Sequence, residues 1–175
     1  MTTSEFGYPD LAALSPDLQE AVSNRASLNI FRMIMHSPNL APGFLTMASD
    51  LLQHNSLPAT WRELVILRVG YRYDARYETY QHERIGLAIG LDDQSIAAVQ
   101  SGALETLEPG AAAVLRLTDL LLDNHTLTDG ERDGALQTLS VNQLADLTLT
   151  VGFYQLVCNF LNTFGVRPEE DGAGQ

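Results

Sequence analysis

The chain has 175 residues and a formal net charge of −12 at pH 7, and its ten basic residues are all arginine because it contains no lysine. The acidic balance argues against nucleic-acid binding, since affinity for phosphates needs a basic surface, and the missing lysine excludes a Schiff-base mechanism. The length fits one domain with one sizeable core, and a hydrophobic content of 45% is ordinary for a globular protein.

The sequence carries no recognisable signal for export or membrane insertion. No apolar run approaches the roughly 20 residues of a membrane span, and the opening residues, MTTSEFGYPD, lack the basic patch and apolar stretch of a signal peptide. We therefore expect a cytoplasmic protein with no membrane partner. The single cysteine, Cys158, excludes an intrachain disulfide, and its apolar helical context favours a buried small residue over a reactive thiol.

Helical periodicity dominates the chain, and alternating strand patterns are scarce. The predicted helices span about 16–24, 27–36, 42–55, 58–70, 75–89, 92–102 and 109–124, followed by two that begin at 128 and 140. We therefore predict an all-α chain of eight or nine helices that forms a single domain over residues 1–175. Its core is expected at about 27–166, with extensions at 1–14 and 167–175.

Several of these boundaries have a physical signal. Asp74 and Asp92 can each cap the helix that follows them, because a short carboxylate accepts hydrogen bonds from the free N–H groups of a first turn. Thr128 and Ser140 are each followed three residues later by Glu or Gln, which is the spacing of a capping box. The last helix is predicted to reach about Phe164.

The chemically informative segment runs from Glu63 to His82. Glu78 and His82 are four residues apart and share one helix face. A short turn favours antiparallel packing, so Glu63 on the preceding helix can face this pair. Two carboxylates beside an imidazole make an acid–base site, in which an adjacent carboxylate holds the imidazole charged or fixes its tautomer. Spacing alone leaves a solvated surface pair open, with Glu63 bound to an arginine for stability.

The same segment resembles the carboxymuconolactone decarboxylase and alkylhydroperoxidase-D (AhpD) family. That family's motif has Glu, eleven residues, Cys, two residues, Cys, three residues and His. On this chain Glu63 and His82 take the first and last positions without a gap, while Ala75 and Glu78 take the two cysteine positions. The resemblance extends loosely over 31–166, and it implies an AhpD-like helical bundle.

The two missing thiols decide which chemistry is expected. Peroxide reduction needs one thiol that attacks and one that resolves, and neither Ala75 nor Glu78 can supply one, so we do not expect a thiol peroxidase. The decarboxylase branch works without the cysteine pair and without a cofactor, and it carries a carboxylate near the second cysteine position, as Glu78 does here. The resemblance therefore implies a cofactor-independent lyase or isomerase that acts by proton transfer on a small carbonyl or lactone compound. The alternative is a non-catalytic binding or assembly protein of the same fold.

In the enzyme hypothesis, His82 is the general acid or base, Glu78 is its partner, and Glu63 orients the pair or returns a proton. Tyr77 and Tyr80 lie on the same predicted helix and could donate hydrogen bonds to an oxyanion. A buried tyrosine is more often a core residue, so a packing role stays open for both.

Two further residues are candidate substrate ligands. His36 lies at a predicted helix end, where a capping role is the usual one. The resemblance to the family also allows it to line the pocket. Arg72 could hold a substrate carboxylate, with a salt bridge to Glu63 or Asp74 as the alternative. We expect no metal and no cofactor, because the resemblance is to proteins that work without them. The resemblance also implies a homo-oligomer, a trimer or hexamer with a dimer possible, and the apolar helix at 144–161 favours self-association.

Overall fold

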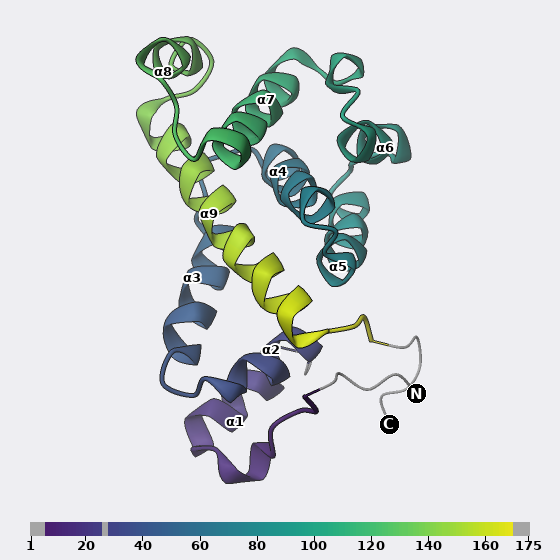
Figure 1. Cartoon of the computed structure of the whole chain (residues 1–175), viewed down its shortest axis with the longest axis vertical. Coiled ribbons are helices and arrows are strands. Elements are labelled where there is room, and N and C mark those ends of the chain that lie inside the picture. The colour runs from purple at the N-terminus through teal and green to yellow at the C-terminus, as the bar shows by residue number, and fades with distance from the viewer. Residues whose placement is uncertain (1–5, 26–27, 170–175) are drawn as a thin grey trace.

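The computed structural model describes residues 6–25 and 28–169, and in that part the chain is helical without strands (Figure 1). Its α-helices are α1 Pro16–Ser23, α2 Asn29–Met33, α3 Ala41–Gln53, α4 Ala59–Arg72, α5 Arg76–Ala88, α6 Asp93–Ser101, α7 Pro109–Asn124, α8 Asp129–Ala135 and α9 Val141–Phe164. Short 3-10 helices cover Leu11–Ala13, Ile34–His36 and Leu104–Thr106. The predicted all-α fold of eight or nine helices is confirmed.

The helix boundaries show which capping signals work. Thr128 and Ser140 both form the predicted capping boxes at the starts of α8 and α9, and Asp92 accepts a hydrogen bond from the backbone of α6. The prediction for Asp74 was wrong, because the residue before α5 is Ala75 and no side chain caps that helix. Asp74 instead takes a left-handed backbone conformation, with φ of 49°. Aspartate tolerates this region, and the chain uses it to turn tightly from α4 into α5.

α4 lies at the centre of the molecule, in contact with α5, α6, α7 and α9. Figure 1 shows it enclosed between α9, α7 and α5. A helix with neighbours on several sides must be apolar around most of its circumference, and α4 has consecutive buried residues, namely Leu64, Val65, Ile66 and Leu67. A smaller apolar cluster, which includes Val22, Met35 and Leu45, joins α1 and α3 at the end of the molecule that carries α1 (Figure 1).

α9 is the longest helix among the described residues and runs along much of the molecule (Figure 1). By length and composition alone it could cross a membrane, although no membrane span was expected from the sequence. This is weak support for a membrane span, because the core helix of a globular protein meets the same criteria. Here α9 packs against α3, α4, α5 and α7. Its buried side includes Cys158, whose thiol pKa is raised by burial and by Glu78, in agreement with the structural role expected of it.

Candidate acid–base site

The site is built on the α4–α5 hairpin, whose two helices pack very closely. At Gly70 of α4, a methyl group would lie 3.0 Å from Cγ2 of Thr79 and 3.6 Å from Cγ of Glu78 on α5. The absence of a side chain at Gly70 therefore allows the approach of the two helices. Their packing brings Glu63, near the start of α4, opposite His82 on α5, which is the arrangement expected from the sequence.

Three buried side chains form a continuous chain of short contacts. The Nδ1 atom of His82 lies 2.6 Å from Oε2 of Glu63, and its Nε2 atom lies 3.0 Å from Oε1 of Glu78. Arg62 donates from Nε and Nη2 to the other oxygen of Glu63, at 3.2 Å each. Glu63 is fully buried, whereas Glu78 and His82 retain 4% and 7% exposure. Glu63 is therefore the anchored end of this chain, and Glu78 is its accessible end.

The two carboxylates set the charge of the imidazole. Burial lowers the pKa of His82, but Glu78 and Glu63 outweigh that effect and raise it to about 10. At neutral pH the ring is therefore an imidazolium, and each of its N–H groups donates to one carboxylate. This narrows the roles expected from the sequence. A charged His82 cannot act as a base, so the group that can accept a proton in the open part of the site is the Glu78 carboxylate.

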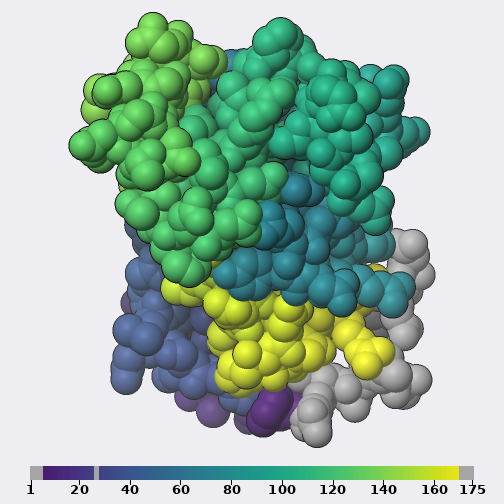
Figure 2. Space-filling model, turned by 45° about the horizontal axis from the view of Figure 1, so that its top comes forward, coloured from purple at the N-terminus to yellow at the C-terminus, as the bar shows by residue number. Residues whose placement is uncertain are grey.

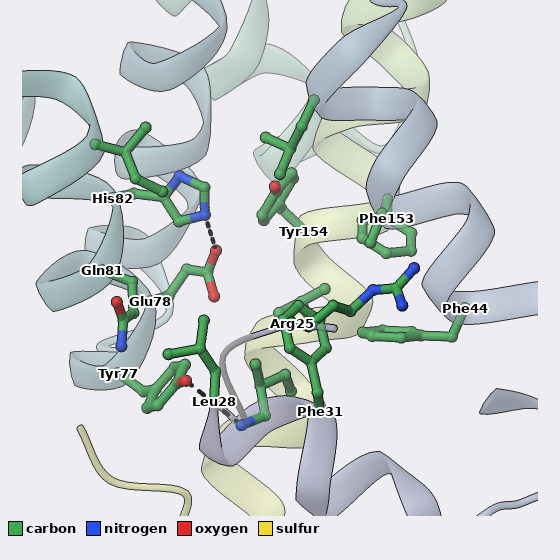
Figure 3. A pocket seen from close by; sticks show the side chains of 15 residues that line it. Arg25, Leu28, Phe31, Phe44, Tyr77, Glu78, Gln81, His82, Phe153 and Tyr154 are labelled. Atoms are coloured by element: carbon green, nitrogen blue, oxygen red, sulfur yellow. Dashed lines mark hydrogen bonds and ion pairs between the residues drawn. The ribbon is translucent and has the colours of Figure 1, made fainter. Parts of the chain in front are cut away.

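A cavity of about 330 Å³ adjoins His82 and Glu78. Figure 3 shows the side chains that line it. Side chains from α2, α3, α5 and α9, together with Arg25 and Leu28 before α2, enclose it, and most are apolar or aromatic. They include Leu28, Ile30, Phe31, Phe44, Ala48, Leu52, Ile85, Phe153, Tyr154 and Val157. Besides the acid–base pair, the polar residues of the wall are Arg25, Tyr77, Gln81 and Tyr154. Such a site suits a small, mostly apolar compound with one reactive polar group.

The two tyrosines predicted on α5 lie in different surroundings. Tyr77 lines the cavity, but its hydroxyl donates to a Glu169 carboxylate oxygen at 3.0 Å and accepts from the Ile30 N–H at 3.4 Å. Tyr80 does not line this cavity. Its hydroxyl accepts from Nη1 of Arg84 at 2.6 Å, and its side chain borders a second, more polar hollow near the C-terminal end of α9.

His36 and Arg72 also lie outside the cavity wall. His36 Nε2 contacts the Gly7 carbonyl oxygen at 3.1 Å, and its ring stacks on Phe164. Arg72 pairs with Asp119 and Asp123 of α7, and not with Glu63 or Asp74. Arg72 comes nine positions after Glu63 on α4, which is two and a half helical turns, so the two side chains leave opposite faces.

Sequence reasoning missed three polar residues of the cavity wall, namely Arg25, Gln81 and Tyr154. Tyr154 meets the His82 ring edge-on, with centroids 5.4 Å apart and an interplanar angle of 86°. Its position on the buried side of α9 indicates a core residue and nothing more. A residue so far along the chain has no fixed spacing to the 63–82 segment, so no sequence signal could have connected them.

Among the described residues, no group of three or more His, Cys, Asp and Glu side chains is arranged to hold a metal ion. Both ring nitrogens of His82 are already engaged by carboxylates. The chain of contacts is therefore arranged to hold protons and charge within the protein.

Comparison with known proteins places this arrangement in a fold. No protein-family model and no curated protein matches the sequence. A structure from Ralstonia eutropha JMP134, described as an alkylhydroperoxidase AhpD core and an uncharacterized peroxidase-related protein, superposes with a TM-score of 0.86 at 19% identity, over 98% of this chain and 95% of that one. The fold is AhpD-like.

Two further solved structures share the AhpD-like fold. An uncharacterized peroxidase-related protein from Silicibacter sp. TM1040 gives a TM-score of 0.82 at 15% identity, over 100% of this chain and 98% of that one. A variant of the debrominase Bmp8, in complex with 2,3,4-tribromopyrrole, gives 0.72 at 12% identity, over 88% of this chain and 86% of that one. Identities this low establish the AhpD-like fold and leave the activity to be argued from the site.

Proposed function

We propose that this chain is an enzyme that transfers protons on a small, largely apolar carbonyl or lactone compound, as a cofactor-independent lyase or isomerase. The observation that carries the proposal is the buried Glu63–His82–Glu78 chain, which ends at an apolar cavity. Burying charged groups costs desolvation free energy. Titrating groups with a shifted pKa beside a cavity are typical of catalytic sites. The debrominase of the same fold binds a small ring compound, which supports a ligand of similar size here.

The arrangement assigns a different task to each residue. Glu78 faces the cavity and takes a proton from the carbon next to the carbonyl, while the C–H electron pair moves into the carbonyl to form an enolate. At that step the negative charge moves from Glu78 to the enolate oxygen, and the imidazolium of His82 supplies positive charge close to both groups. Glu63, held by Arg62, keeps the imidazolium in place. Return of the proton from Glu78 to another carbon completes an isomerisation. In a decarboxylation, the C–C electron pair forms the enolate as carbon dioxide leaves, and the His82 imidazolium supplies the proton that reaches carbon by way of Glu78.

The cysteine content supports this reading over thiol chemistry. Ala75 and Glu78 occupy the positions where the resemblance would place two thiols. Cys158 is fully buried, and its raised pKa disfavours the reactive thiolate. The chain therefore has no pair of thiols with which to attack and resolve a peroxide.

Hydrogen exchange tests the proposal directly. Purified protein is incubated in D₂O with a panel of cyclic ketones, γ-lactones and β-keto acids, and deuterium at the carbon next to the carbonyl is followed by NMR. We expect the wild type to catalyse exchange on part of the panel, and Glu78→Gln to lose about 10²–10⁴-fold of the rate. Tyr80→Phe, which alters a hydroxyl outside the cavity, is the matched control and should keep the rate. Binding without exchange by the wild type would identify a non-catalytic binding protein instead.

A further inference from the structure

We infer that Tyr154 is a further catalytic residue, which donates a hydrogen bond to the carbonyl oxygen of the bound compound as that oxygen becomes an oxyanion. This inference rests on the proposed function and adds a residue from a distant helix. Figure 3 shows Tyr154 on α9 facing His82 and Glu78 on α5, and its ring contacts the edge of the His82 ring. All three side chains line the cavity, so a compound bound there meets a proton acceptor from α5 and a phenol from α9.

The Tyr154 hydroxyl has an unused donor. The side chain is only 4% exposed, yet none of the described residues forms a hydrogen bond with this hydroxyl. Every fully enclosed side-chain oxygen and nitrogen atom in the described part of the chain has a partner, which leaves the Tyr154 hydroxyl open to the cavity that its side chain lines. Because buried polar groups are normally paired, an unpaired phenol beside the acid–base pair indicates a hydrogen bond to a ligand.

The other polar side chains of the cavity wall already have protein partners. The Tyr77 hydroxyl and the Gln81 side-chain amide both donate to Glu169. Arg25 donates to the Ala21 carbonyl oxygen and lies over the ring of Phe31. Both N–H groups of His82 face carboxylates. Among the hydroxyl groups of the cavity wall, Tyr154 is thus the one that can donate to a ligand oxygen without breaking a contact with the described residues.

The charge of the neighbourhood suits this role. Burial and the nearby carboxylates Glu78 and Glu63 raise the pKa of Tyr154 well above its ordinary value, so the phenol keeps its proton over the working pH range. The phenol therefore donates a hydrogen bond without giving up its proton during the reaction. When Glu78 takes the proton from carbon, the electron pair moves to the carbonyl oxygen, and the Tyr154 O–H group stabilises the negative charge there.

Tyr154→Phe tests the inference because it removes the hydroxyl and keeps the ring that packs against His82. In the exchange assay we expect kcat to fall by about 10²–10³-fold, with KM changed little. Tyr73→Phe is the matched control, since the Tyr73 hydroxyl accepts a hydrogen bond from Gln155 outside the cavity, and it should keep kcat. If Tyr154→Phe is fully active while Glu78→Gln is inactive, the role of Tyr154 is overturned and the proposed function is retained.

A binding measurement makes the test independent of turnover. 4-Nitrophenolate is a ring with an exocyclic oxyanion, and it reports its own ionisation by absorbance. We expect it to bind the wild type at least tenfold more tightly than Tyr154→Phe, a difference of about 1.4 kcal/mol, and Tyr73→Phe should match the wild type. Equal affinities for wild type and Tyr154→Phe, or no binding to the wild type, would overturn the inference. Circular dichroism and thermal unfolding verify that both variants are folded.

Discussion

His82 holds its proton more tightly in the folded chain than in the unfolded one. Its folded pKa is about 10, against an ordinary value of about 6.5. A raised folded pKa means that the stabilisation from this proton is fully present below about pH 6.5 and is lost as pH rises through about 10. Alkaline conditions therefore weaken the fold at this residue, even though both partners are carboxylates.

We expect the free energy of unfolding to fall between about pH 6.5 and about pH 10, with a slope from His82 of up to about 1.4 kcal/mol per pH unit. Urea denaturation at several pH values measures it. His82→Gln should remove that part of the slope, because the amide does not titrate. His54→Gln, on a histidine whose side chain is 72% exposed, is the matched control. A slope unchanged in His82→Gln would show that the imidazole is neutral in the folded protein.

Glu63 should dominate the stability of the site, because it neutralises two neighbouring cations. Glu63→Ala leaves Arg62 and the imidazolium of His82 without their shared partner in a buried setting. We expect a loss of about 3–5 kcal/mol in the free energy of unfolding, and a smaller loss for Glu63→Gln, which keeps the shape. Asp133→Ala, on an exposed carboxylate of α8, should stay within about 0.5 kcal/mol of the wild type. A similar small effect for Glu63→Ala would contradict a charged network.

At this scale, local periodicity could predict Glu63, Glu78 and His82 as neighbours because all three lie on one helical hairpin. The same periodicity, applied to α4, places Arg72 on the face opposite Glu63. The resemblance to the family does not by itself reveal that separation. Tyr154 could not be predicted, since its place beside His82 depends on how α9 packs across the hairpin.

At the scale of elements, the start of α7 packs tightly on α4. A methyl group at Gly110 would lie 2.4 Å from Cζ2 of Trp61. Gly152, on α9, has nothing within 4 Å of the same position. We expect Gly110→Ala to lower the free energy of unfolding by about 1–3 kcal/mol through overpacking, and Gly152→Ala to raise it by about 0.5–1 kcal/mol because alanine restricts the unfolded chain. Urea denaturation compares the two, and a stabilised Gly110→Ala would mean that Trp61 moves aside freely.

Glu169 ties the segment after α9 to the wall of the cavity. Its carboxylate accepts from the Asn29 N–H at 2.6 Å, from the Tyr77 hydroxyl at 3.0 Å, and from the Gln81 amide. Tyr77 and Gln81 both line the cavity. We expect Glu169→Ala to increase amide hydrogen exchange in α2 and to weaken binding of 4-nitrophenolate by several-fold, while Asp133→Ala changes neither. Unaltered exchange in α2 would show that apolar packing alone holds this wall.

Element boundaries could be predicted where a side chain closes the helix end locally. Thr128, Ser140 and Asp92 all behave as their spacing indicates. Asp74 does not, because the close packing of α4 and α5 requires a left-handed residue in the turn between them. The segment predicted as one helix over 27–36 also differs, since α2 ends at Met33 and continues as a 3-10 helix to His36. Tertiary packing decides both cases, and local sequence does not encode it.

At the scale of the whole molecule, α9 presents an outer face that the described part of the chain leaves uncovered. Leu149 and Leu156, seven residues apart and thus on one side of the helix, are each 52% exposed. No charged residue occurs between 147 and 166. In Figure 2, the yellow C-terminal part of the chain reaches the surface between α3 and α5. On a chain with a net charge of −12, an uncharged face is where two copies can approach with the least repulsion.

We therefore expect a second copy of the chain to cover this face, and sedimentation should show wild-type protein heavier than one chain. Leu149→Glu combined with Leu156→Glu should lower the mass toward the monomer, because association would then bury unpaired charges. Leu136→Glu, at a 42% exposed position beyond α8, is the matched control and should leave the mass unchanged. A monomeric wild type that instead co-sediments with lipid vesicles would assign the face to a membrane. The variants separate these cases from core damage, since neither leucine is buried in the fold and both altered proteins should keep the thermal stability of the monomer.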